Sequence, residues 1–194
     1  MKLPSPLVIA TGNPGKLREI RAILAGQAPP DITGLPDYPE YQPPEETAPD
    51  YQGNAVLKVL HAAHTLGMAA LADDSGLEVD TLGGAPGPRS ARYAGEGALD
   101  HANNLKLLAE LEGRMPAAAR YRCVVALAWP DGKFVTAEGT CEGVIVSEAR
   151  GAGGFGYDPY FRLPDGRGMA EIPAEEKNRI SHRAAALFSL LESL

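Results

Sequence analysis

The chain has 194 residues, of which 44% are hydrophobic, and it carries a formal net charge of −7 at pH 7. Such a chain can bury a full core and is expected to form a single domain over residues 1–194, and its negative charge argues against nucleic acid as a partner, because the phosphate backbone requires a basic face. No apolar run approaches the roughly 20 residues that span a bilayer, and the first six residues lack the apolar segment of a signal peptide, so no membrane partner and a cytoplasmic location are expected.

The first predicted unit is a strand, a loop and a helix. Leu7–Ala10 is a short apolar run typical of a buried strand, and the apolar periodicity of residues 17–24 predicts a helix with Pro14 near its start. Between them lies Thr11-Gly12-Asn13-Pro14-Gly15-Lys16. Backbone N–H groups at such a helix start, with Lys16 beside them, can bind phosphate. The segment lacks the first glycine and the Ser/Thr of a P-loop, so a phosphate site and a plain turn both stay open.

Residues 28–49 are rich in proline, tyrosine and acidic residues, which predicts an irregular connection with one short strand near residues 32–35. A connection this long inside a compact domain is usually functional. It carries Glu40, Glu45 and Glu46, any of which could reach a site elsewhere, although most glutamates in such a segment are simply solvated.

Two adjacent carboxylates follow the next predicted strand. A helix is expected from Gly53 to Leu66, with Lys58 as a surface lysine, and the apolar run Met68–Ala72 then predicts a buried strand. Asp73 and Asp74 come directly after it, and Ser75-Gly76 predicts a turn, so both carboxylates are expected at a strand end. Because adjacent carboxylates repel each other, a divalent metal ion beside them would stabilise the pair. A solvated turn is the alternative.

The second half of the chain predicts a helix and a hairpin. Apolar periodicity indicates a helix over residues 100–111, with Asp100 as its N-cap. Two β-rich runs, 121–129 and 134–141, flank an Asp-Gly turn and predict a hairpin, with residues 144–146 as an extension. The two cysteines, Cys123 and Cys141, are expected to be buried thiols.

A glycine-rich segment and a terminal helix complete the chain. Residues 151–161 place glycines around aromatic side chains; glycine permits close approach to a ligand and Phe155 could stack on a base. The alternative is a tight loop whose aromatics fill the core. Ser181 is expected to cap the last helix, with His182 and Arg183 in its first turn, where backbone N–H groups also point outward. A simple capped helix is the alternative there.

Together these segments resemble the inosine/xanthosine triphosphate pyrophosphatases, also called the Ham1-like or non-standard purine pyrophosphatase family. The resemblance runs the length of the chain. Its motifs are Thr11-Gly12-Asn13-Pro14-Gly15-Lys16, Ala72-Asp73-Asp74-Ser75-Gly76-Leu77, Gly83-Gly84-Ala85-Pro86-Gly87, Ser90-Ala91-Arg92-Tyr93, Gly154-Phe155-Gly156-Tyr157-Asp158-Pro159, Glu176-Lys177 and Ser181-His182-Arg183.

The resemblance implies an α/β fold, an elongated domain with a long mixed β-sheet flanked by helices and two lobes around a central cleft, usually paired as a homodimer. It implies that Asp74 is the general base and that Glu46 and Asp74 hold Mg²⁺. The residues implied to bind substrate are Thr11, Gly12, Asn13, Pro14, Gly15, Lys16, Ser75, Phe155, Gly156, Tyr157, Asp158, Lys177, His182 and Arg183. Segment 11–16 would hold the triphosphate.

The sequence departs from the usual family pattern beside the implied metal ligand. Both Glu45 and Glu46 precede the helix that bears Lys58, and Glu46 fits the expected spacing better. Nearby, Ala48 stands where glycine is common, and Gly53 stands where glutamate is common.

The activity implied by the resemblance is hydrolysis of ITP, dITP and XTP to the monophosphate and pyrophosphate, by metal-assisted attack of water on the α-phosphate, which would cleanse the nucleotide pool. Lys16, Lys177 and loop amides would stabilise the phosphate charge, so that an acidic protein can bind a polyanion. One alternative is a nucleotide-sensing module without hydrolysis, although carboxylates beside a triphosphate hinder binding unless a metal is recruited. Another is a phosphatase or kinase acting at a different phosphate.

Overall fold

The computed structural model describes residues 3–25 and 31–194, so the part of the predicted connection at residues 28–30 lies outside the described residues. The strands are β1 (Leu7–Ile9), β2 (Ile32–Gly34), β3 (Ala69–Val79), β4 (Ala117–Ala128), β5 (Phe134–Ile145) and β6 (Phe161–Arg162). The α-helices are α1 (Pro14–Leu24), α2 (Tyr51–Leu66), α3 (Asp100–Glu110), α4 (Ala174–Ile180) and α5 (His182–Ser193). Short 3₁₀ helices cover Leu35–Asp37, Asp80–Leu82, Gly87–Arg92, Asp158–Tyr160 and Met169–Glu171.

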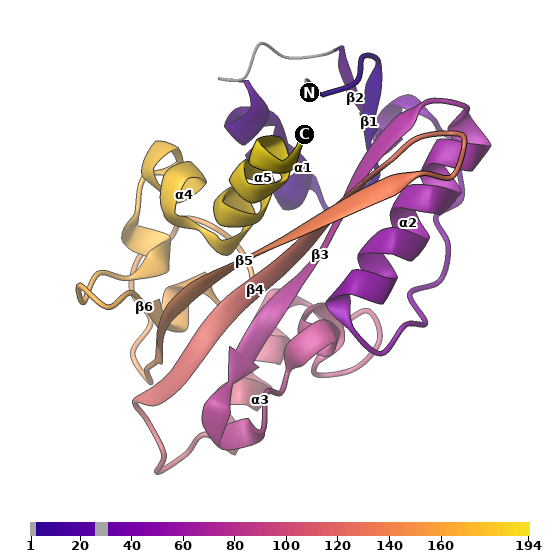
Figure 1. Ribbon diagram of the computed structural model, residues 1–194. Coiled ribbons are helices and arrows are strands. Elements are labelled where there is room, and N and C mark those ends of the chain that lie inside the picture. Colours follow the sequence, from indigo (N-terminus) through magenta and orange to yellow (C-terminus); the bar gives the residue numbers. More distant parts are fainter. Residues whose placement is uncertain (1–2, 26–30) are drawn as a thin grey trace. The chain divides into compact units, whose positions relative to one another are not determined.

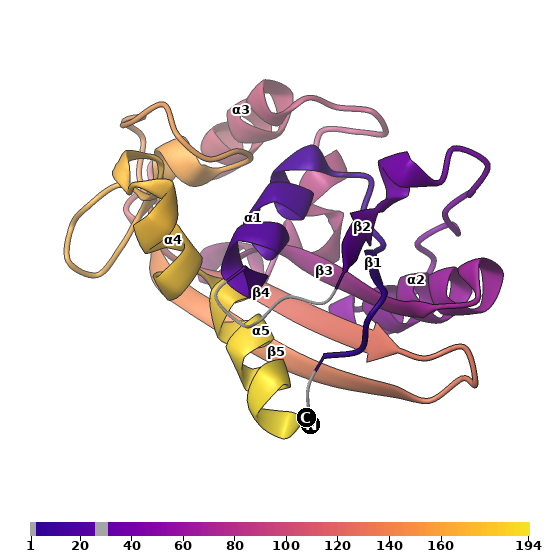
Figure 2. The same ribbon diagram turned by 90° about the horizontal axis from the view of Figure 1, so that it is seen from above.

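Within the described residues, six strands form one sheet in the order β2-β1-β3-β4-β5-β6 (Figure 1). β1 pairs in parallel with β2 and β3, whereas β5 and β6 pair antiparallel, so the sheet is mixed. The expected α/β fold with a mixed sheet and flanking helices is confirmed. The predicted hairpin is also confirmed: Figure 2 shows β4 and β5 side by side, and the N–H of Trp129 donates to the carbonyl of Lys133 across the turn (2.9 Å).

The chain divides into two compact units. The first comprises Met1–Asp74, Cys123–Gly139 and His182–Leu194, and the second comprises Ser75–Arg122 and Thr140–Ser181. The boundary falls inside β3, β4 and β5, so each of these strands contributes residues to both units. Each unit has hydrophobic clusters of its own. The single domain expected over residues 1–194 stays a prediction.

Helices cover both faces of the sheet in the first unit. Successive side chains of a strand point to opposite faces. Ala69 and Leu71 of β3 accordingly pack with α1 and α5, whereas Ala70 and Ala72 pack with α2. Figure 1 shows α1 and α5 to one side of β3 and α2 to the other. Burial on both faces explains why this part of β3 is apolar throughout instead of alternating.

The ends of α2 are set by local chemistry. Asp50 is its N-cap, and the carboxylate accepts a hydrogen bond from the N–H of Gly53 (2.7 Å). The helix ends at Gly67, whose φ of 65° glycine adopts at little steric cost. The predicted C-terminus is thus confirmed, and the helix starts two residues earlier than predicted.

β3 does not end where the sequence predicts. The turn expected at Ser75-Gly76 is wrong, because β3 continues through this dipeptide to Val79. Leu77 and Val79 are fully buried in the hydrophobic cluster of the second unit. Their burial overrides the local turn preference of the Asp-Asp-Ser-Gly sequence, as tertiary packing commonly does in strands. The two aspartates therefore lie in mid-strand and not at a strand end.

The predicted start of α3 also changes, and one further helix is present. The N-cap of α3 is Leu99, and Asp100 is the first helical residue. A short helix that the sequence analysis does not predict, α4, precedes Ser181, which is its C-cap. Glu175 and Glu176 in the first turn of α4 complement the positive end of its dipole.

The remaining sequence expectations concern the start of α5, the cysteines and membrane spans. His182 and Arg183 begin α5, as predicted. Cys123 and Cys141 are free and buried, which confirms the two buried thiols. Among the helices of residues 3–25 and 31–194, none is long and apolar enough to cross a bilayer.

Candidate active site

Asp74 lies among polar side chains on the α2 face of the first unit. Its Oδ2 accepts a hydrogen bond from Asn54 Nδ2 (3.2 Å), and its Oδ1 lies 3.5 Å from Lys58 Nζ. The same Nζ lies 2.7 Å from Oε1 of Glu46. One ammonium group therefore holds two carboxylates from separate segments, because Glu46 belongs to the irregular connection and Asp74 to β3.

The surroundings of Asp74 favour its acting as a base. Burial raises the pKa of Asp74 above its ordinary value, and the charge of Glu46 adds to this, although Lys58 and Lys16 oppose it. A carboxylate with a raised pKa accepts a proton more readily. Burial works against the charge of Lys58, but the neighbouring carboxylates outweigh it and raise the pKa, so Lys58 stays protonated.

The side chain of Asp73 lies on the other face of the sheet. Its Oδ2 accepts hydrogen bonds from Nε (3.2 Å) and Nη2 (3.0 Å) of Arg183, and Lys16 Nζ lies 3.2 Å from the same oxygen. Arg183 is 1% exposed and also donates to Glu19 of α1. Burial alone would raise the pKa of Asp73, but the charges of Lys16 and Arg183 outweigh it and hold that pKa far below its usual range. Asp73 is therefore a permanently ionised anchor.

Segment 11–16 joins β1 to α1, and some of its backbone N–H groups donate hydrogen bonds to side chains of the same segment. Oδ1 of Asn13, the N-cap of α1, accepts hydrogen bonds from the N–H groups of Gly15 (2.8 Å) and Lys16 (3.1 Å). Thr11 is buried, and its Oγ1 accepts from the N–H of Asn13 (3.2 Å). Pro14 is the first helical residue, and a Cβ added at Gly12 would meet open space. Two of the amides expected to bind phosphate are thus capped by Asn13.

The residues present fit a two-carboxylate magnesium site. The charged side chains linked here are the cations Lys16, Lys58 and Arg183 and the anions Glu19, Glu46, Asp73 and Asp74. On the α2 face alone, Glu46 and Asp74 carry two negative charges against the single positive charge of Lys58, so one negative charge is in excess there. No group of three or more metal-ligating side chains occurs among the described residues. Mg²⁺ commonly uses only one or two carboxylates together with water and substrate phosphates, so Glu46 and Asp74 suffice.

In the second unit, Asp158 holds together the glycine-rich segment. Its Oδ1 accepts from the hydroxyl of Tyr121 (3.0 Å), and its Oδ2 accepts from the N–H of Phe155 (3.0 Å) and from Lys177 Nζ (2.5 Å). Burial and the adjacent carboxylate raise the pKa of Tyr121 well above its ordinary value, so the phenol stays a donor. Lys177 Nζ also lies 4.9 Å from the centre of the Phe155 ring. This cation and ring are thereby fixed relative to each other.

The neighbours Gly156 and Tyr157 are held by the rest of the second unit. The N–H of Gly156 donates to Asp100 Oδ2 (2.7 Å), and its carbonyl accepts from Asn104 Nδ2 (2.9 Å). The hydroxyl of the buried Tyr157 donates to the carbonyl of Ser90 (2.8 Å). Tyr157 therefore fills the core, as the alternative interpretation of this segment expects, whereas Phe155 is only half-buried and its stacking on a base stays a prediction.

The sequence-predicted site residues divide between the units. The first unit contains Thr11, Gly12, Asn13, Pro14, Gly15, Lys16, Glu46, Asp74, His182 and Arg183, and the second contains Ser75, Phe155, Gly156, Tyr157, Asp158 and Lys177. Within the first unit, direct contacts link Glu46 to Asp74 through Lys58, and Lys16 to Arg183 through Asp73. Within the second, they link Phe155, Asp158 and Lys177.

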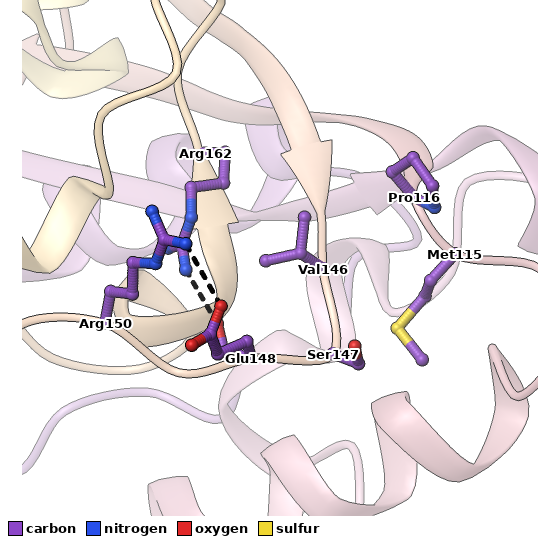
Figure 3. A pocket seen from close by; sticks show the side chains of 7 residues that line it. All are labelled: Met115, Pro116, Val146, Ser147, Glu148, Arg150 and Arg162. Atoms are coloured by element: carbon purple, nitrogen blue, oxygen red, sulfur yellow. Dashed lines mark hydrogen bonds and ion pairs between the residues drawn. The ribbon is translucent and has the colours of Figure 1, made fainter.

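A cavity of about 280 Å³ in the second unit contains none of these residues. Its lining is Met115, Pro116, Val146, Ser147, Glu148, Arg150 and Arg162 (Figure 3). Arg162 donates to the carbonyl of Glu148 (2.7 Å), and Arg150 donates to the Glu148 carboxylate (3.1 Å). The cations of this cavity are therefore bonded to its own lining.

A family model described as the Ham1 family matches residues 7–193. The chain belongs to the Ham1 family. A dITP/XTP pyrophosphatase of Geobacter sulfurreducens is 50% identical to it over 97% of this chain and 96% of that protein, and one of Desulforamulus reducens is 49% identical over 97% and 94%. Among solved structures, Ham1 proteins of Staphylococcus aureus and Coxiella burnetii match with TM-scores of 0.84 and 0.86, at 39% and 38% identity, each covering 96% of both chains.

The structure explains the two departures from the usual Ham1 family pattern. A Cβ built on Gly53 would lie 2.5 Å from the Cβ of Ala48, closer than two carbon atoms can pack. The methyl group of Ala48 therefore fills the space that a side chain at position 53 would need. The glycine at position 53 thus compensates sterically for the methyl group of Ala48.

Sequence reasoning missed two residues of this Ham1 family site. Lys58 was expected at the surface, but its side chain is only 13% exposed and bridges Glu46 and Asp74. Asn54 is 1% exposed and bonds to Asp74. The available signal was their spacing of four residues, which places both on one helix face.

Proposed function

We propose that this protein hydrolyses the non-standard purine nucleoside triphosphates ITP, dITP and XTP to the monophosphate and pyrophosphate, by attack of water on the α-phosphate. The observation that carries the proposal is the cluster in which Lys58 joins Glu46 and Asp74. It combines one cation, Lys58, with a carboxylate of raised pKa, Asp74. The names of the Geobacter and Desulforamulus relatives support the same activity.

The side chains of the first unit supply the chemistry in this proposal. Lys16 turns from Asp73 toward the triphosphate and neutralises oxygen charge that grows as pyrophosphate leaves. Asp74 accepts the proton of the attacking water, and its pKa, raised by burial, suits that task. Asp73 stays bonded to Arg183 and holds β3 against α5.

Glu46 and Asp74 would hold Mg²⁺, and Glu45 is the less suitable ligand because it is exposed whereas Glu46 is bonded to Lys58. When bound, the ion would neutralise phosphate charge and orient the phosphates. In the absence of substrate Lys58 partly offsets the repulsion between the two carboxylates, which accounts for how they can share one site.

Base selection in this proposal rests on hydrogen-bond donors at the start of α5, and the stacking of Phe155 on a base stays a separate prediction. Hypoxanthine and xanthine present a 6-oxo acceptor where adenine presents an amino donor, so adenine leaves buried donors unpaired. Such a mismatch can discriminate by about 10,000-fold. The Arg183 guanidinium is bonded to Asp73 and Glu19. The donors assigned to the base are therefore the backbone and His182, with Arg183 as their support.

Product analysis tests the proposal. Incubation with ITP and Mg²⁺ is expected to release inosine monophosphate and pyrophosphate in equal amounts, with kcat/KM well above that for ATP. Diphosphate plus phosphate would instead identify a phosphatase acting at another bond. Tight binding without turnover would identify a nucleotide sensor.

We further propose that the protein works as a homodimer in the cytoplasm. This rests on the family resemblance, and the absence of a membrane-spanning helix among the described residues is compatible with it. Sedimentation at micromolar protein concentration tests the homodimer, and a measured mass equal to that of a single chain would contradict it.

A further inference from the structure

Asn54 joins two parts of the first unit through opposite ends of one amide. Its Oδ1 accepts a hydrogen bond from the N–H of Ala48 (3.0 Å), and its Nδ2 donates to Oδ2 of Asp74 (3.2 Å). The residue is 1% exposed and lies in the first turn of α2, on rigid structure. The amide thereby holds the backbone at Ala48, two residues from Glu46. It also orients the carboxylate of Asp74.

The segment that bears Glu46 is held against α2 by bonds that involve side chains. Residues 41–48 have no helix or strand, so no ladder of backbone hydrogen bonds positions them. Its bonds to α2 include Tyr41 to His61 (2.9 Å), Glu46 to Lys58 (2.7 Å) and the backbone N–H of Ala48 to Asn54 (3.0 Å). Two of these partners also reach Asp74: Lys58 through its charge (3.5 Å) and Asn54 through a hydrogen bond (3.2 Å), and of the two only Asn54 bonds to the backbone of the segment.

We propose that Asn54 is a positioning residue that sets the separation and orientation of the Glu46 and Asp74 carboxylates. The inference rests on the proposed function, because these carboxylates are its proposed metal ligands. A carboxylamide suits this role since it accepts from one partner and donates to the other without adding charge. Residues that orient metal ligands typically affect metal affinity or activity by about 10- to 100-fold.

Variants at position 54 separate the two bonds. Asn54→Ala removes both. Asn54→Asp keeps an acceptor for the N–H of Ala48 but loses the donor to Asp74. Tyr41→Phe is the matched control, because it removes another tether between the same segment and α2 without touching Asp74.

Hydrogen exchange on the metal-free protein tests whether Asn54 holds the backbone at Ala48. Asn54→Ala should speed amide exchange at Ala48 and its neighbours at least tenfold, whereas Asn54→Asp should leave Ala48 protected. Tyr41→Phe should speed exchange only near residue 41. Unchanged exchange at Ala48 in a folded Asn54→Ala protein would overturn the inference.

Turnover of ITP as a function of Mg²⁺ concentration tests whether Asn54 positions the two carboxylates for the metal ion. Both Asn54 variants should lower kcat by about 10- to 100-fold, and Asn54→Ala should also raise the Mg²⁺ concentration for half-maximal rate, with a smaller change in the KM for ITP. Tyr41→Phe should keep the wild-type kcat and Mg²⁺ dependence. If Asn54→Ala does not fold, Asn54→Asp decides: wild-type kcat with Ala48 protected would overturn the inference.

Glu46→Gln distinguishes this inference from the proposed function. If the wild type releases no pyrophosphate, or Glu46→Gln leaves the Mg²⁺ requirement unchanged, the proposed function or its metal site fails. If Glu46→Gln raises the requirement and the Asn54 variants do not differ from the wild type, the positioning role alone fails.

Discussion

Asp73 and Asp74 are consecutive residues of β3, but their carboxylates bond to different helices. Asp73 is bonded to Arg183 of α5, and Asp74 to Asn54 of α2. Alternation along a strand separates the two charges, so their mutual repulsion is less severe than at the predicted turn. It also gives the carboxylates opposite pKa shifts, which assigns anchoring to one and proton transfer to the other.

Asp74→Asn should remove nearly all turnover while nucleotide binding largely remains. The amide keeps the shape of the side chain but neither accepts a proton nor holds magnesium well. Loss of a general base typically costs about 100- to 10,000-fold in rate. Pyrophosphate release at saturating Mg²⁺ measures the effect, and a variant that kept more than about a tenth of the wild-type rate would remove Asp74 from the catalytic role.

Lys16→Ala should weaken the binding of triphosphates much more than the binding of the corresponding nucleosides. The ammonium group is expected to contact phosphate, where hydrogen bonds between charged groups are strong. Asp73 keeps Arg183 as a partner in this variant, so the fold should persist. Calorimetric titration with ITP and with inosine provides the comparison, and equal losses for both would place Lys16 outside the phosphate site.

Arg183→Ala should destabilise the first unit and reduce the preference for ITP over ATP. The change leaves the buried carboxylate of Asp73 with Lys16 but without its guanidinium, and breaking a buried ion pair typically costs about 3–5 kcal/mol. Denaturant unfolding measures the loss, and kcat/KM for ITP and ATP measures selectivity. A variant of wild-type stability and unchanged preference would contradict both the anchoring role and the account of base recognition.

Gly53→Ala should destabilise the protein, because the added methyl group collides with Ala48. In the Ala48→Gly background the same change should destabilise the protein much less, because the contact with Ala48 is gone and only the contact with Asp50 Oδ1 (3.2 Å) remains to offset the preference for alanine in a helix. A double-mutant cycle of unfolding free energies shows whether the positions are coupled. Additive effects would contradict the compensation between Ala48 and Gly53.

Several local elements and the family resemblance could be predicted from the amino-acid sequence. Apolar periodicity located α1 and α2, the Asp-Gly turn located the hairpin, and Gly67 marked the end of a helix, because each depends on residues close together in the chain. The motifs identified the candidate site residues, because each motif is also a run of neighbouring residues.

The course of β3 and the partners of the buried charges depend on contacts between distant segments and could not be predicted. The strand continues past Ser75-Gly76 because Leu77 and Val79 are buried against segments distant in sequence. Lys58 is a bridge and not a surface lysine because the connection bearing Glu46 packs on α2. Arg183 and Asp73 are 110 residues apart in the chain. Their pairing depends on sheet and helix packing, and no local pattern encodes it.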